Sequence, residues 1–210
     1  MITSATRSGT PRRAIAGFSM IELVVSIFVM LILTALAIPS LMRSMRTYQL
    51  NSAAASVSDM LKFTRFEAVR RNTQINLQFS QSGPGWLVWT DSFAAGNGGP
   101  IDPRDKQQAI AGYATLLVYA SPPIPAPNVI STALGGATLT PKSGSNGSVT
   151  FDARGAIRQS IGGPISSSLY IFYVGNATDP DSGYRAVVLL PSGGVQIWTA
   201  PIGGTWRQVS

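Results

Sequence analysis

The chain has 210 residues, of which 45% are hydrophobic and only 12% charged, and it contains no cysteine and no histidine. Without cysteine there can be no disulfide, thiolate metal site or cysteine nucleophile, and without histidine the commonest general base and metal ligand are missing. We therefore expect a non-enzymatic protein with no cofactor and no metal site. The 21 glycines and 14 prolines favour a loop-rich β domain, and the length allows one such domain plus an extension.

The net charge is +7, and three of the arginines, Arg7, Arg12 and Arg13, lie within residues 1–17, which contain no acid. A short basic segment that directly precedes an apolar run is better explained as a signal for membrane topology than as a nucleic-acid-binding segment. The basic composition alone is therefore a weak argument for DNA.

Residues 18–38 form an apolar run of 21 residues that contains a single charge, Glu22. This length is enough to cross a hydrocarbon core of about 30 Å as one helix. Because Arg12 and Arg13 hold the preceding end in the cytoplasm, the rest of the chain is expected beyond the inner membrane. No other segment of comparable length lacks charges, so we predict one transmembrane helix.

Glu22 is unusual inside such a helix, because an ionised carboxylate there costs roughly 2.5–3.5 kcal/mol on insertion scales. One interpretation places it near the membrane interface, where the cost shrinks. The interpretation that we favour is that Glu22 pairs with a positive charge from another chain.

The run from Gly17 to Leu23, GFSMIEL, resembles the processing site of type IV prepilins and type II secretion pseudopilins. In that family a short basic leader ends in glycine, phenylalanine follows, and a glutamate lies four residues further on. The resemblance implies that a prepilin peptidase cuts between Gly17 and Phe18 and that the new amino terminus at Phe18 is N-methylated. It also implies assembly with other pilins.

The chemistry of the cleaved end is consistent with that implication. Phe18 would carry an α-amino group that stays cationic after methylation, and Glu22 lies one helical turn away. In a staggered stack of subunits, the amine of one chain can instead meet Glu22 of a neighbour. Because an unpaired charge is costly where water is excluded, such a pair would fix the axial register.

An ordinary secretory signal peptide is the alternative interpretation of the N-terminus. Arginines, an apolar stretch and Ala35-Leu36-Ala37 follow the order of a signal peptide with an A-x-A cleavage site. The apolar run is longer than the usual 7–15 residues and contains an acid, which disfavours this interpretation. The mature N-terminal residue, Phe18 or Ile38, distinguishes the two.

Beyond the membrane the helical pattern continues to Asn72. Pro39 should kink or loosen the helix, because it removes one backbone hydrogen bond and clashes with the preceding turn. Apolar and small residues then recur at helical spacing, which predicts a face packed on a sheet. This stripe consists of Leu50, Ala53, Ala54, Val57, Met60, Leu61, Thr64 and Ala68.

From Thr73 the period changes to two, which predicts β-strands. Residues 75–79 and 85–90 form the first predicted hairpin, around Ser82-Gly83-Pro84-Gly85. Residues 91–112 are expected to form a long loop, and the prolines after residue 120 predict an extended stretch outside the sheet. The further predicted strands are 115–120, 148–153, 156–161, 168–174, 184–190 and 195–199.

One long helix followed by an antiparallel β domain is an α+β arrangement. The predicted organisation is a leader at 1–17, a long helix at 18–72 that is transmembrane over 18–38, and a globular β domain at 73–210. The globular domain is expected in the periplasm, with the subunit first in the bacterial inner membrane and then in a pilus or pseudopilus.

The globular half narrows the resemblance to the GspH/FimT group of minor pilins and pseudopilins. The residues that carry it are the helix end RFEAVRRN at 65–72, GWLV at 85–88, VTFDARG at 149–155, RAVVL at 185–189 and GGV at 193–195. The resemblance implies a structural subunit of a type IV pilus or type II secretion filament. Some FimT-like members bind DNA through arginines near the last hairpin, whereas residues 192–196 here read SGGVQ, without arginine.

Other candidate sites are weaker. Arg154, Arg158 and Arg185, with Arg207 and Lys142, could form a basic patch for DNA, although scattered surface charge is the simpler interpretation. The segment 179–183, DPDSG, could supply oxygens to calcium, but two acids are few, and a solvated turn is favoured. Four aromatic residues are expected in the core rather than at a ligand site: Trp86, Trp89, Phe151 and Trp198.

Overall fold

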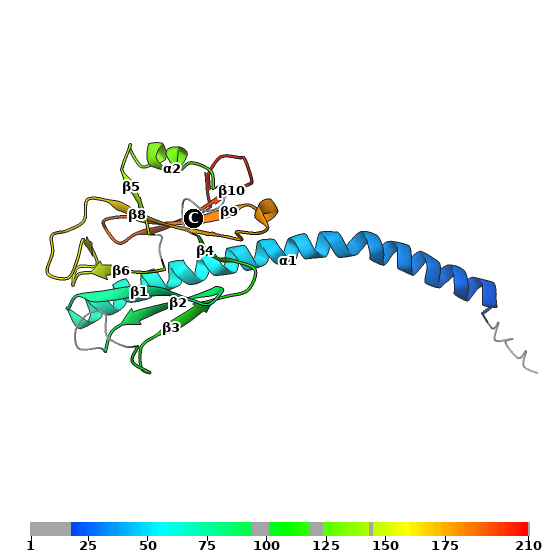
Figure 1. The fold of residues 1–210 in the computed structure, drawn as a ribbon, viewed down its shortest axis with the longest axis horizontal. Helices are drawn as coiled ribbons and strands as arrows, with labels where there is room; N and C mark the ends of the chain where they lie inside the picture. Colours follow the sequence, from blue (N-terminus) through cyan, green and yellow to red (C-terminus); the bar gives the residue numbers. More distant parts are fainter. Residues whose placement is uncertain (1–17, 94–100, 118–123, 143–144, 210) are drawn as a thin grey trace, which may run out of the picture. The chain divides into compact units, whose positions relative to one another are not determined.

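The computed structural model describes residues 18–93, 101–117, 124–142 and 145–209 (Figure 1). The chain divides into two compact units, the first ending at Met42 and the second beginning at Arg43. Helix α1, Met20–Arg71, contributes to both units, and each unit is described by itself.

Of the first unit, the structure describes residues 18–42, which are Phe18, Ser19 and the N-terminal part of α1. The helix begins with a capping interaction in which the Glu22 N–H donates to Ser19 Oγ at 3.2 Å. Within the described residues, one helix is long and apolar enough to cross a membrane, and none of its most apolar segment is buried. The hydroxyls of Ser26 and Thr34 donate to carbonyl oxygens one turn earlier, at 2.7 Å each, so these polar groups are satisfied within the helix.

The second unit contains the rest of α1, which packs on the β domain. All eight residues of the predicted stripe are buried, from Leu50 to Ala68. The helix ends in a Schellman motif, in which the Thr73 N–H donates to Ala68 O at 3.1 Å and the Asn72 N–H donates to Val69 O at 3.2 Å. Asn72 adopts a left-handed φ of 50°, which asparagine tolerates better than most residues. The predicted stop at Asn72 is confirmed.

The first sheet has five antiparallel strands in the order β3-β2-β1-β6-β7. Strand β1 is central and pairs with β2 through the tight turn at 83–84 and with β6 on its other side. The alternation of Ile75, Leu77 and Phe79 puts these three side chains in the core. The strand bounds are β1 Ile75–Ser82, β2 Gly85–Asp91, β3 Gln107–Ile110, β6 Asn146–Phe151 and β7 Ile157–Arg158.

The second sheet has the order β11-β10-β9-β8-β4, with β5 also paired to β8. The pairing of β5 with β8 is parallel, and all the other strand pairs in the sheet are antiparallel. Strands β8 and β9 are buried along their whole length because both faces of this sheet are covered. The bounds are β4 Thr115–Leu117, β5 Leu139–Pro141, β8 Leu169–Gly175, β9 Tyr184–Leu189, β10 Val195–Ala200 and β11 Arg207–Gln208.

Two hydrophobic clusters lie on opposite faces of the second sheet. The larger one joins the stripe of α1 to both sheets, where Phe79 packs edge-on against Phe172 at 5.6 Å between ring centroids. The smaller one lies under α2, Asn128–Ala133, and includes Ile130 of that helix and Trp206. Figure 1 shows α2 on the side of this sheet away from α1. The four aromatic residues assigned to the core are all buried.

The predicted α+β class, with a long helix before a largely antiparallel β domain, is confirmed. The loop predicted over 91–112 was wrong in part, because Gln107–Ile110 form β3, the edge strand beside β2. The sequence shows no alternating pattern over this strand, because its residues are mostly polar or exposed, which a strand at the edge of a sheet tolerates. Residues 94–100 of that loop and 118–120 of the predicted strand 115–120 lie outside the described residues.

Among the described residues, four further short elements were missed, and one predicted strand was too long. Helix α2 follows the proline-rich stretch, β5 and β11 contain three and two residues, and Pro180–Ser182 form a 3₁₀ helix. The strand predicted over 156–161 is limited to Ile157–Arg158, because the chain turns around Gly162 and Gly163. Elements this short carry too few residues for a periodic pattern.

Candidate functional site

The N-terminal motif lies at the first turn of α1. Phe18 precedes the helix and is 77% exposed, and Glu22 is exposed in the first turn. Glu22 forms no ion pair with any residue that the structure describes. A carboxylate in the first turn also interacts favourably with the helix dipole. Gly17, the other half of the predicted cleavage site, lies outside the described residues.

The cap of this helix is Ser19, which the sequence analysis did not single out. Ser19 and Glu22 have the S-x-x-E spacing of a capping box, and this spacing was readable in the sequence. The cap starts the helix two residues after Phe18, so the predicted new amino terminus directly precedes the first turn. Pro39 lies within α1, whose helical assignment continues on both sides of it, and the kink remains a prediction.

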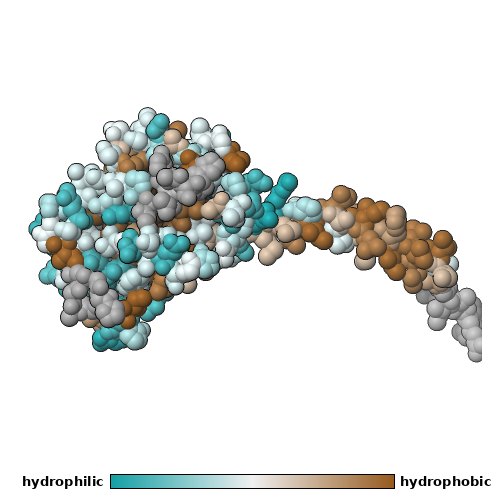
Figure 2. Space-filling model, viewed as in Figure 1, coloured by the Kyte–Doolittle hydropathy of each residue, from teal (hydrophilic) through white to brown (hydrophobic). Residues whose placement is uncertain are grey.

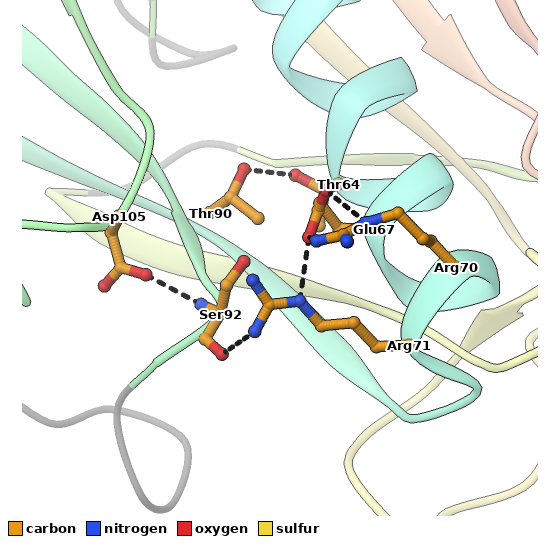
Figure 3. Close-up of polar contacts among 7 residues, drawn as sticks. All are labelled: Thr64, Glu67, Arg70, Arg71, Thr90, Ser92 and Asp105. Atoms are coloured by element: carbon orange, nitrogen blue, oxygen red, sulfur yellow. Dashed lines mark hydrogen bonds and ion pairs between the residues drawn. The ribbon is translucent and has the colours of Figure 1, made fainter.

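The polar network in Figure 3 joins the C-terminal end of α1 to β2. The buried Glu67 carboxylate accepts hydrogen bonds from Arg70 at 3.0 and 2.7 Å and from Arg71 at 2.8 Å. Arg71 also donates to Ser92 O at 2.9 Å, and the Ser92 N–H donates to the buried Asp105. The hydrogen bonds from Arg70 lower the pKa of Glu67 against the opposing effect of burial, and those from Arg71 add to the lowering.

A second contact in Figure 3 lies deeper between the same elements. The Thr64 and Thr90 hydroxyls are 2.8 Å apart and fully buried, and Thr64 Oγ1 also donates to Met60 O at 2.8 Å. In the segment 65–72, which carried the family resemblance, Arg71 joins the end of α1 to Ser92 after β2, and Arg65 joins it to Gly155 after β6. Glu67 holds Arg70 and Arg71 within the helix.

Two glycine turns pack against α1 near this end. Gly155 follows β6 and Gly193 connects β9 to β10, and both have a φ of +79°. Arg65 Nε donates to Gly155 O at 3.2 Å. A Cβ on Gly193 would overlap Gly155 O and lie 2.7 Å from Arg65 Nε. The glycines of the resembling segments 149–155 and 193–195 are therefore needed for close backbone packing.

Arg154 and Arg158 lie together beside an open cleft of about 640 Å³. Arg154 is exposed on the turn after β6, whereas Arg158 is half-buried. Arg158 Nη1 donates to Gly163 O at 2.6 Å, and its Nη2 lies 3.6 Å from Asp152 Oδ2. The cleft is lined by Asn72, Thr73, Gln74, Asp152, Ala153, Arg154, Arg158, Ile161 and Ile165.

Arg185, the third candidate for DNA contact, lies elsewhere, with only 8% of its surface exposed. Its Nε donates to Asn51 Oδ1 at 2.7 Å, and its Nη1 donates to Tyr184 O at 3.0 Å. Burial lowers the pKa of Arg185. The structure thus uses Arg185 to join β9 to α1 and does not place its guanidinium beside those of Arg154 and Arg158.

The remaining candidates are also separated. Lys142 Nζ lies 4.2 Å from the Tyr170 ring centroid and donates to Ser148 O at 3.2 Å, and burial lowers its pKa. Arg207 is exposed in β11. In the segment considered for calcium, Asp179 pairs with Arg46 at 2.7 Å. Among the described residues there is no group of three acidic side chains that could hold a metal ion.

Residues 53–194 match the family described as type II transport protein GspH. No match was found among curated proteins.

Two solved structures with a similar fold are crystal forms, P21 and P65, of the type IV minor pilin FimU of Pseudomonas aeruginosa strain PAO1. The first is 17% identical, with a TM-score of 0.45, over 78% of this chain and 94% of FimU. The second is 16% identical, with a TM-score of 0.43, over 77% of this chain and 98% of FimU.

The family match covers well over half of the chain and includes the end of α1, the first sheet and the turn at Gly193. It coincides with the segments whose packing is described above. The chain belongs to the GspH family of minor pilins and pseudopilins.

Proposed function

We propose that this protein is a structural subunit of a type IV pilus or type II secretion filament. A prepilin peptidase cuts it between Gly17 and Phe18, and a methyltransferase modifies the new amine of Phe18. The mature subunit has its long helix at 18–72, anchored in the bacterial inner membrane over 18–38, and its domain at 73–210 in the periplasm. It then joins other pilins in the filament and performs no catalysis of its own.

The observation that carries the proposal is the uncovered first turn of an apolar helix. Figure 2 shows apolar side chains along this part of the molecule, and Phe18, Met20 and Ile21 are each at least 70% exposed. An apolar surface of this extent is not stable in water, so a membrane and later other helices must cover it. Minor pilins and pseudopilins, the family to which the chain belongs, supply such helices.

Glu22 supplies the specificity of this packing. Its carboxylate has no ion-pair partner among the described residues, and it lies in the first turn of α1, four residues after Phe18. Removal of the leader would create a cation at Phe18. In the filament, the cation of one subunit would satisfy Glu22 of the next, because both charges lose water there and a mispaired register would leave them unsatisfied.

Mass spectrometry of the N-terminus of the protein from cells tests the processing step. We expect a chain that begins at methylated Phe18, and Gly17→Arg should leave the leader attached. A mature chain that begins at Ile38 would contradict the proposal and support a signal peptide instead.

Assembly is tested with charge variants of Glu22. Glu22→Ala and Glu22→Gln should still be cleaved but should enter filaments poorly, whereas Glu22→Asp should retain part of the assembly. Ser26→Ala, one turn further along the same helix, is the matched control and should assemble normally. Normal assembly of Glu22→Gln would refute the role of the charge in register.

DNA binding during natural transformation is the alternative function, and it has less geometric support. Exposed Arg154 favours it, but Arg158 contacts Asp152 and Arg185 is buried. A gel-shift assay at rising salt tests it, because phosphate contacts weaken steeply with salt. A DNA shift that the wild type produces and Arg154→Gln does not would support DNA binding. Capture of other minor pilins in the absence of DNA would support the structural role.

A further inference from the structure

A polar cleft of about 520 Å³ opens at the start of the second unit. Three of its lining residues, Arg43, Arg46 and Thr47, come from α1, and the other two, Asp181 and Ser182, come from the short 3₁₀ helix Pro180–Ser182. The cleft therefore combines cationic, anionic and hydroxyl groups from two elements far apart in the sequence.

Some of the charged groups at this cleft already have partners. Arg46 pairs with Asp179 at 2.7 Å and lies over the Tyr113 ring, 5.4 Å from its centroid. The Tyr113 hydroxyl lies 2.9 Å from Ser182 Oγ and donates to Asp179 O at 3.1 Å. These contacts fix the 3₁₀ helix against α1 and hold the walls of the cleft in place.

Two groups of opposite charge are left over. Arg43 and Asp181 are both exposed and both line the cleft. Neither forms an ion pair or a side-chain hydrogen bond with the part of the chain that the structure describes, and they do not pair with each other. The cleft thus presents one cation and one anion to a ligand that carries the complementary pair.

The position of Arg43 in the sequence indicates where that ligand is found. Arg43 lies five residues after Ile38, the last residue of the predicted transmembrane segment 18–38. At about 1.5 Å per residue, its Cα lies about 8 Å or less beyond the hydrocarbon edge, which is the depth of the lipid headgroups. A cation on the outer flank of the helix also runs against the usual charge bias of membrane proteins.

We propose that this cleft binds the phosphoethanolamine headgroup of a membrane phospholipid, with Arg43 donating to the phosphate and Asp181 accepting from the ammonium. The inference rests on the proposed insertion of 18–38 in the membrane. An anionic glycerol headgroup offers no cation to Asp181, and the quaternary ammonium of choline has no N–H to donate. The cleft therefore selects phosphatidylethanolamine over both other classes and orients the subunit at the membrane surface before assembly.

Native mass spectrometry of the full chain, released from nanodiscs, tests the proposal. Equal amounts of phosphatidylethanolamine, phosphatidylglycerol and phosphatidylcholine are supplied, and the lipids that stay bound are counted. We expect preferential retention of phosphatidylethanolamine. Arg43→Gln should lower it about tenfold, the loss expected for one charge-assisted hydrogen bond. Asp181→Asn should lower retention of phosphatidylethanolamine but not of phosphatidylglycerol.

Asp59→Asn and Lys62→Gln are matched controls, because both residues are exposed on α1 away from the cleft, and both should behave as wild type. Equal retention of the three lipids, or equal effects of Asp181→Asn and Asp59→Asn, would overturn the proposal. So would a dimer that is lost in Arg43→Gln, because the cleft would then bind a second copy. Flotation with vesicles separates this failure from a failure of the proposed function, since a chain without a membrane anchor would not float at all.

Discussion

The two glycine turns against α1 allow a stability prediction that separates backbone strain from steric overlap. In Gly193→Ala the new Cβ would meet Gly155 O and the Arg65 side chain at a φ of +79°. Alanine in the left-handed region costs about 1–2 kcal/mol. Forcing an extra methyl into a packed site costs about a further 1–3 kcal/mol. We expect a total loss of about 2–5 kcal/mol in the free energy of unfolding.

The matched control is Gly135→Ala. Gly135 has a similar φ of +74°, but nothing lies within 4 Å of its Cβ position, so this variant should lose only the strain of about 1–2 kcal/mol. Urea denaturation of the full chain in detergent micelles, followed by tryptophan fluorescence, measures both variants. Because Trp86, Trp89, Trp198 and Trp206 are all buried in the second unit, the signal reports on that unit.

Equal losses in the two variants would refute the reasoning, because the overlap with Gly155 O would then contribute nothing. Gly155→Ala supplies an intermediate case. Its Cβ would meet Arg65 Nε at 2.7 Å, and a flexible side chain can move where a backbone carbonyl cannot. Its loss should therefore fall between those of the other two variants.

Three further predictions concern the contacts of α1 with the sheets. Thr64→Val should lower the free energy of unfolding by about 1–3 kcal/mol, because it leaves the buried Thr90 hydroxyl without its partner. The double variant Thr64→Val/Thr90→Val should lose less stability than the sum of the two single variants. A double-mutant cycle, measured by urea denaturation, gives this coupling. The hydrogen bonds from Arg70, more than any other contact, lower the pKa of Glu67 in the folded protein below its ordinary value of 4.5. The stability that Glu67 contributes should therefore be present above that value and be lost as the pH falls through the folded pKa. Urea midpoints measured across this pH range should fall less on acidification in Glu67→Gln than in the wild type. Arg185→Gln should lower the melting temperature of the full chain without changing DNA retention in a gel-shift assay, and loss of retention at unchanged stability would contradict its buried role.

Local patterns in the sequence were sufficient for the long elements. The change from helical period to alternation at residues 72–73 marks the end of α1, because asparagine at 72 accepts the left-handed conformation and Ile75, Leu77 and Phe79 then alternate. The apolar run with Glu22 likewise predicts a membrane helix with a functional charge, and its first turn was readable from the S-x-x-E spacing at Ser19.

Tertiary contacts decided the rest. The sequence alone does not distinguish Arg154, Arg158 and Arg185 as candidates for DNA contact. The packing of β9 on α1 buries Arg185, whereas Arg154 stays exposed. The strand β3 exists because β2 offers an unpaired edge, not because its own residues alternate. Similarly, Arg43 and Asp181 share a cleft only because Arg46 and Asp179 bring distant segments together. Periodicity is a property of neighbours along the chain, whereas burial and charge pairing depend on which distant segments meet.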